Sequence, residues 1–97
     1  MLSSSLPNSP EGWVIRNQVT KSGTGIGANY REANRARSKA DFTSKIKICE
    51  SEASETAYWL ELIEDLNWAG SKKVDLLLKE TNELLAIFST IGKTLKL

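Results

Sequence analysis

A chain of 97 residues is long enough for one domain, and its 40% hydrophobic and 26% charged residues exclude a wholly disordered protein. The absence of histidine and the single cysteine, Cys49, exclude His-dependent catalytic triads, Cys/His metal clusters and an intramolecular disulfide. Residues 1–48 carry eight Lys/Arg against three acids, whereas residues 49–97 carry five against nine. One half is therefore basic and the other acidic, which is compatible with a polyanion partner, head-to-tail self-association or simply solvated faces.

The first eight residues are small, polar and rich in turn formers, so we expect them to be disordered or a bare lead-in before a single helical domain over residues 9–97. This start has no apolar run of signal-peptide length. No stretch approaches the roughly 20 apolar residues that span a bilayer. The expected compartment is the cytoplasm, with no membrane partner.

The first helix is predicted over about residues 10–36. Ser9 is a good N-cap, Pro10 suits the first turn, and Glu11 complements the helix dipole. Apolar or small residues then recur every three or four positions as one stripe, through Ile15, Val19, Ser22/Gly23, Ile26, Tyr30 and Ala33. Helical glycines each cost about 1 kcal/mol relative to alanine, but the stripe stays in register across them. We interpret Gly23 and Gly27 as a surface where another helix approaches closely.

Two further helices are predicted over about residues 39–68 and 72–96. Ser38 begins a capping-box pattern that ends at Asp41, and the stripe that follows is the strongest periodic signal in the chain. Gly70 is placed for a left-handed C-cap, and Ser71 is the expected cap of the last helix. Because only short connections separate the helices, the fold class is all-α, an up-down antiparallel helical bundle. A fourth helix would close the bundle, so with three helices either the open apolar face is shared with another copy or the domain is only marginally stable.

Known catalytic and metal-binding patterns are not matched. The segment 22–27 is rich in glycine but lacks the preceding strand and the Gly-Lys-Ser/Thr of a phosphate loop. The carboxylates of the second helix have no histidine to complete a di-metal site. Cys49 lies on the packing stripe without a partner base. We therefore expect no enzyme activity, no cofactor and no metal.

Two polar groups of residues are candidate sites. At the edge of the packing stripes, Asn29, Arg31 or Glu32 of the first helix are expected to meet Glu52 or Glu55 of the second and to fix the helix register, because a buried carboxylate needs partners. Around the junction of the first two helices, six cations fall within seventeen residues: Arg31, Arg35, Arg37, Lys39, Lys45 and Lys47. Such a basic corner could contact phosphates without sequence specificity, or it could be a solvated surface or an interface with an acidic neighbour.

Four linked patches resemble a known bacterial family. They are Leu6-Pro7-Asn8, the segment 22–33 (SGTGIGANYREA), the segment 35–42 (RARSKADF) and the segment 53–62 (ASETAYWLEL). In this order they are similar to the four-helix-bundle proteins encoded in intervening sequences of 23S ribosomal RNA genes. The resemblance spans about residues 6–97.

The resemblance implies a bundle that is commonly a ring-shaped homopentamer without known enzymatic activity. A related accessory protein of diversity-generating retroelements is a basic pentamer that binds nucleic acid and a reverse transcriptase, and this analogy points to Arg31, Arg35, Arg37, Lys39 and Lys45. Family members usually begin with an amphipathic helix before the Leu-Pro-Asn segment. This sequence therefore resembles a member without its first helix.

Two hypotheses of function follow from these patterns. The first is a non-enzymatic, self-associating bundle that contacts RNA or DNA non-specifically through the basic corner. The second is a protein–protein adaptor or structural oligomer with no role in nucleic-acid binding.

Overall fold

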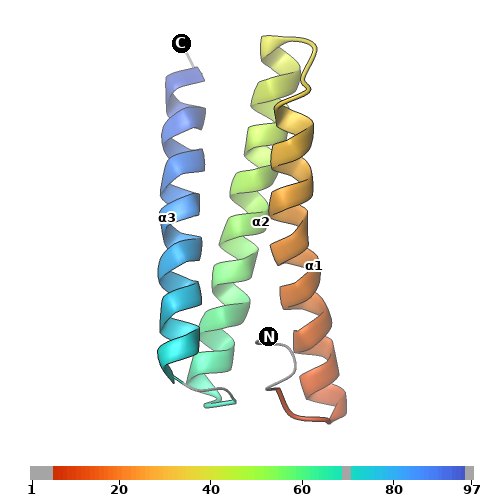
Figure 1. Ribbon diagram of the computed structural model, residues 1–97, viewed down its shortest axis with the longest axis vertical. Coiled ribbons are helices and arrows are strands. Elements are labelled where there is room, and N and C mark those ends of the chain that lie inside the picture. The colour runs from red at the N-terminus through yellow and green to blue at the C-terminus, as the bar shows by residue number, and fades with distance from the viewer. Residues whose placement is uncertain (1–5, 69–70, 96–97) are drawn as a thin grey trace.

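Three long helices make up the protein: α1 (Pro10–Ala33), α2 (Lys39–Asp65) and α3 (Ser71–Leu95). The structure is a computed structural model that describes residues 6–68 and 71–95. α2 lies between the other two helices and runs antiparallel to both, and α1 and α3 each pack along it (Figure 1). The helices form a rod 44 Å long, and the predicted all-α bundle is confirmed.

The start of α1 follows the sequence prediction, but its end does not. The Ser9 hydroxyl accepts a hydrogen bond from the Gly12 amide at 3.1 Å, and Pro10 is the first helical residue. The helix ends at Ala33 rather than near Ala36. The Arg35 and Ala36 amides donate to carbonyls three residues earlier, which tightens the chain into a turn before the next helix.

α2 begins as predicted and ends earlier than predicted. The Ser38 hydroxyl accepts from the Asp41 amide at 3.0 Å. At the other end Asn67 adopts a left-handed conformation (φ 55°), and the Trp68 amide donates to the Ile63 carbonyl. This Schellman-type cap ends the helix three residues before the expected boundary near residue 68. The cap expected at Gly70 lies outside the described residues, and Ser71 is itself the first residue of α3.

Residues 6–8 belong to the segment expected to be disordered or a bare lead-in, and they are packed against the helices. Leu6 is buried in a cluster with Ile15 of α1, Ile63 of α2 and Val74 of α3, so it packs against all three helices at one end of the rod. Beside it the Pro7 carbonyl oxygen would collide with a Cβ atom on Gly12. The close approach of this segment to α1 therefore requires glycine at position 12.

The core follows the predicted stripes along the two faces of α2. Toward the junction of α1 and α2, a second cluster contains Ile26, Ala33, Ile46, Cys49, Ala53 and Phe88. These side chains come from all three helices. Every buried side-chain nitrogen or oxygen in the described part of the chain has a hydrogen-bond partner.

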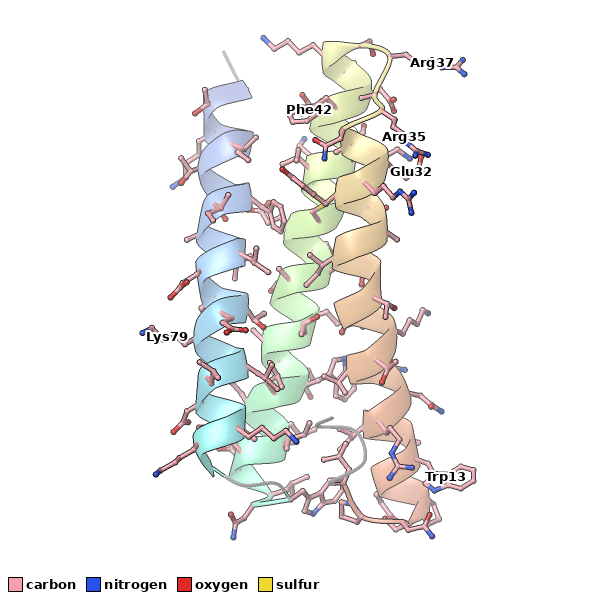
Figure 2. The ribbon with its side chains drawn as sticks, viewed as in Figure 1. Trp13, Glu32, Arg35, Arg37, Phe42 and Lys79 are labelled. Carbon is pink, nitrogen blue, oxygen red and sulfur yellow. The ribbon has the colours of Figure 1, made fainter. Side chains whose placement is uncertain are left out.

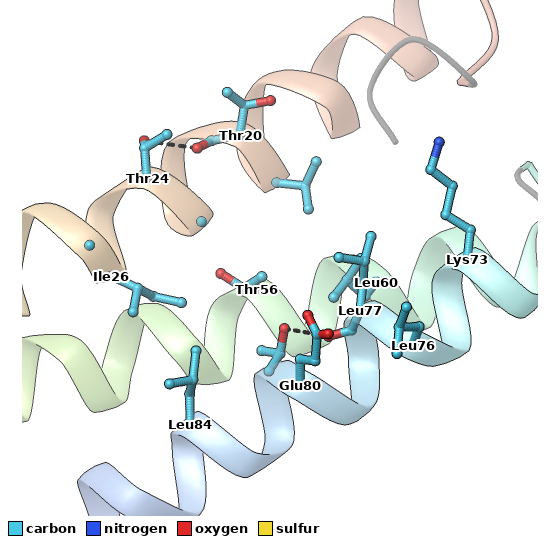
Figure 3. Close-up of a pocket in the computed structure, with 14 residues that line it drawn as sticks. Thr20, Thr24, Ile26, Thr56, Leu60, Lys73, Leu76, Leu77, Glu80 and Leu84 are labelled. Carbon is cyan, nitrogen blue, oxygen red and sulfur yellow. Dashed lines mark hydrogen bonds between the residues drawn. The ribbon is translucent and has the colours of Figure 1, made fainter. Parts of the chain in front are cut away.

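The bundle is open on one side, where α1 and α3 face each other across α2. A groove of about 770 Å³ lies there, with Thr56 and Leu60 of α2 at its base (Figure 3). Gly23 and Gly27 line its α1 wall, and no atom lies within 4 Å of a Cβ built on either glycine. Among residues 6–68 and 71–95, no helix makes the close approach predicted at these glycines. Instead Gly25 faces α2, where its Cβ would meet a Glu52 oxygen at 2.8 Å.

Candidate nucleic-acid interface

The five predicted nucleic-acid-binding residues gather at one end of the rod. Arg31 lies in the last turn of α1, Arg35 and Arg37 lie in the connection, and Lys39 begins α2. All four side chains are exposed, and Lys45, one and a half turns further along α2, is half-buried. Arg35 and Arg37 point outward from this end, away from α3 (Figure 2).

Local hydrogen bonds hold the connection between α1 and α2 in shape. The Arg37 amide donates to the Asp41 carboxylate at 3.4 Å, while the Asp41 amide donates to Ser38. On the α1 side, the Arg35 amide donates to the Glu32 carbonyl at 3.0 Å. The guanidinium groups of Arg35 and Arg37 are therefore mounted on an ordered turn rather than on a long loop.

The side chains of these cations are unpaired within the part of the chain that the structure describes. Considering residues 6–68 and 71–95, none of Arg31, Arg35, Arg37, Lys39 and Lys45 forms an ion pair. The last turn of α3 adds Lys93 at the same end, since the C-terminus of α3 lies beside the connection (Figure 1). Over residues 31–45 five Lys/Arg stand against two acids, Glu32 and Asp41, so an anion that approaches this end would meet a net positive charge.

The four residues of the predicted polar seam, Asn29, Glu32, Glu52 and Glu55, do not form one connected cluster. The Asn29 amide donates to the Gly25 carbonyl of its own helix at 2.8 Å, and half-buried Glu52 lies against Gly25. Glu32 is exposed next to the basic residues, where its side chain points outward (Figure 2). Exposed Glu55 accepts from the Trp59 indole at 3.5 Å. Asn29 and Glu52 thus meet the same residue without a hydrogen bond between their side chains.

Sequence reasoning missed the polar contact that does join α1 and α2. The Thr56 hydroxyl lies 2.9 Å from the Ser22 hydroxyl, with both residues buried. Ser22 was counted as a small member of the apolar stripe of the first helix, and only the register of the two helices could have paired it with Thr56. A further contact, in which the Ser89 hydroxyl donates to the Glu50 carboxylate, joins α3 to α2.

The chemistry available elsewhere in the described residues is sparse. Cys49 is fully buried, burial raises the pKa of its thiol, and its sulfur lies 3.9 Å from the Ile26 carbonyl oxygen. A buried neutral thiol is a poor nucleophile. Residues 6–68 and 71–95 contain no group of three or more acidic, cysteine or histidine side chains able to hold a metal ion. Within the same ranges, none of the helices has the length and apolar character needed to cross a membrane.

Comparison with known proteins identifies the family. The family model described as "23S rRNA-intervening sequence protein" matches residues 1–90. The fold is similar to the crystal structure of a protein of unknown function from the S23 ribosomal protein family of Bacteroides thetaiotaomicron VPI-5482. That similarity has a TM-score of 0.86 and 37% sequence identity, and covers 95% of this chain and 85% of the other. No curated protein matches the chain significantly. The chain belongs to the family of 23S rRNA-intervening sequence proteins.

Proposed function

We propose that this protein is a non-enzymatic, self-associating helical bundle that binds RNA or DNA through the phosphate backbone at the basic end of the rod. The observation that carries the proposal is the set of exposed cations at the junction of α1 and α2, none of which has an ion-pair partner among the described residues. Arginine and lysine side chains of this kind bind phosphates by charge and release counterions, without reading sequence.

The two ends of the rod differ in a way that supports this choice. At the opposite end, where α2 leads into α3, the acidic residues Glu61, Glu64, Asp65 and Asp75 gather beside Lys72 and Lys73. A polyanion would therefore be attracted to one end and repelled from much of the other, which orients the protein on a nucleic acid.

Salt dependence of RNA binding tests the proposal. Fluorescence anisotropy with a labelled 20-nucleotide RNA of mixed sequence, from 50 to 200 mM salt, measures log affinity against log salt. If about four phosphates are contacted, the slope for a single strand is about −3. A slope near zero, or no binding at 50 mM salt, would overturn the proposal.

A matched pair of triple variants locates the interface. Replacing Arg35, Arg37 and Lys39 by Gln is expected to weaken RNA binding at least about tenfold and to flatten the salt slope. The control replaces Lys21, Lys72 and Lys79 by Gln, which removes the same charge from exposed positions elsewhere. Equal losses in both variants would assign binding to net charge and contradict an interface at the basic end. Circular dichroism of both variants checks that the helices are retained.

A further inference from the structure

One exposed side of α1 carries positive charge over most of its length. Between Glu11 and Glu32 the sequence of this helix contains Arg16, Lys21 and Arg31 and no acidic residue. Positions recur at spacings of three and four along one side of the helix, which we call the outer face, and all of them are exposed: residues 13, 17, 21, 24, 28 and 31. A polyanion that lies along the outer face would therefore meet cations without meeting a carboxylate until the two ends of the helix.

The outer face of α1 is continuous with the basic end of the rod. Arg31 belongs to both, and Arg35 and Trp13 project from the same side of the rod (Figure 2). Trp13 and Arg31 lie eighteen residues apart, which is five helical turns and about 27 Å. Exposed Glu32 borders the face near its junction with the basic end. A nucleic-acid strand held at the basic end thus has a path along α1 that leads to Trp13.

Trp13 is an aromatic ring held in place at the far end of this path. Its side chain is 57% exposed, and its indole N–H donates to the Asn8 side-chain oxygen at 2.9 Å. Asn8 follows Leu6, which is buried against all three helices, so the partner of the indole is itself anchored. Because the ring is already oriented and its N–H is engaged, a base that stacks on it orders little and meets an apolar surface.

The residues of the outer face favour a single strand over a duplex or a protein. An aromatic ring accepts only a base that is not already stacked inside a duplex, while lysine and arginine take the phosphates. Protein interfaces have an apolar core from which charged residues are depleted. Here Lys21 occupies the middle of the face, and exposed Asn17 and Thr24 lie beside it. A row of cations that ends at a fixed aromatic ring is the combination that binds single strands without sequence preference.

We infer that a single-stranded nucleic acid extends from the basic end along the outer face of α1, with phosphates beside Arg31 and Lys21 and one base stacked on Trp13. The inference rests on the nucleic-acid binding in the proposed function and names its substrate class. The face is distinct from the groove between α1 and α3, whose α1 wall includes Val19 and Gly23. Binding along the outer face therefore does not depend on the open side of the bundle.

Variants of Trp13 test the stacking contact. With the labelled 20-nucleotide RNA as a single strand, Trp13→Ala is expected to weaken binding about tenfold without changing the salt slope, because stacking releases no counterions. Trp13→Phe keeps a ring and is expected to restore most of the affinity. Tyr58, on α2, is an equally exposed aromatic residue (58%), and Tyr58→Ala is expected to leave binding unchanged. A loss below about twofold for Trp13→Ala, or equal losses for Trp13→Ala and Tyr58→Ala, would overturn the inference.

A single charge in the middle of the outer face tests the path between the two ends. Lys21→Gln is expected to reduce the magnitude of the salt slope by about 0.7, the value of one phosphate contact on a single strand. Lys79→Gln removes the same charge from a side chain that points away from α1 and α2 (Figure 2), and is expected to leave the slope unchanged. Lys21 is one of the lysines in the triple control variant above, which is therefore expected to lose one phosphate contact against three at the basic end. An unchanged slope for Lys21→Gln would contradict the path along α1.

The type of strand separates this inference from the proposed function. The same RNA annealed to its complement is expected to bind more weakly than the single strand, and Trp13→Ala is expected not to change its affinity. A wild type that binds neither RNA at 50 mM salt overturns the proposed function. Binding that depends on the basic end but is insensitive to Trp13→Ala on both RNAs overturns this inference alone. Light scattering of Trp13→Ala completes the test, since a smaller assembly than the wild type would assign Trp13 to a contact between copies and also overturn the inference.

Discussion

Two neighbouring faces of α1 have opposite surroundings. The face toward α2 is closed: Ser22 is buried, hydrogen-bonds across to Thr56, and Ile26 packs against Cys49 and Ala53. The face one residue further round, with Gly23 and Gly27, meets open space. Both faces were part of a single small-residue stripe in the sequence. Helical periodicity thus identifies the faces of a helix that can be buried. The number of helices in the bundle decides which of those faces are buried.

The largest expected effect on the free energy of unfolding comes from two alanine variants that remove the same number of carbons, one from the closed core and one from the open groove. Ile46→Ala and Leu76→Ala both delete three carbons, from a side chain 1% exposed and from one 57% exposed. The core variant is expected to lose about 2–5 kcal/mol of unfolding free energy through lost burial and a cavity. The groove variant is expected to stay within about 0.5 kcal/mol.

Urea denaturation at low micromolar protein, where association contributes least, measures both variants. Equal losses from the two variants would show that Leu76 is covered in the monomer.

Smaller effects on stability are expected at two glycines of α1, Gly12 and Gly23, and the two effects have opposite signs. Gly12→Ala places a Cβ against the Pro7 carbonyl oxygen, and because that oxygen belongs to the backbone, the N-terminal segment must shift at a cost of about 1–3 kcal/mol. Gly23→Ala adds a methyl group in open space and is expected to stabilise the helix by about 1 kcal/mol. Thermal unfolding followed by circular dichroism compares them. A destabilising Gly23→Ala at low protein concentration would reveal a neighbour at that wall within the monomer.

Local signals predicted the helix starts well and the helix ends poorly. Ser9 and Ser38 cap α1 and α2 as their sequences indicate, since an N-cap needs only a hydroxyl and the next turn of backbone. The end of α2 depends on Asn67 in a left-handed conformation, for which asparagine is a weaker signal than the glycine three residues later. Leu6 escaped prediction because the cluster that buries it draws on all three helices.

The basic end was predictable because it is local in the sequence, whereas the groove was not. Arg31, Arg35, Arg37 and Lys39 lie within one helix junction, so their proximity follows from chain connectivity. The groove instead combines α1 near Gly23 with α3 near Leu76, some fifty residues away. Its existence depends on how three helices distribute around α2.

The smallest expected effect on stability concerns the exposed edge of the contact between α2 and α3. There, outside the packed interior, Glu64 lies near other carboxylates. The pKa of Glu64 is raised above its ordinary value of 4.5, first by a hydrogen bond with Asp75 and then by the negative charges of Asp75, Asp65 and Glu61. A carboxyl whose pKa is higher in the folded protein than in the unfolded chain binds its proton more tightly when folded. The stabilising contribution of the Glu64 proton is therefore present in full below the pKa of the unfolded chain, and it is lost as pH rises through the pKa of the folded protein.

Glu64→Gln keeps the polar side chain without the charge, so it is expected to be slightly more stable than the wild type at pH 7. The two should converge as pH falls through the range in which Glu64 takes up its proton. Urea unfolding of both proteins between pH 7 and pH 4 measures the difference, and a constant offset across that range would show that the Glu64–Asp75 contact does not titrate in the folded protein.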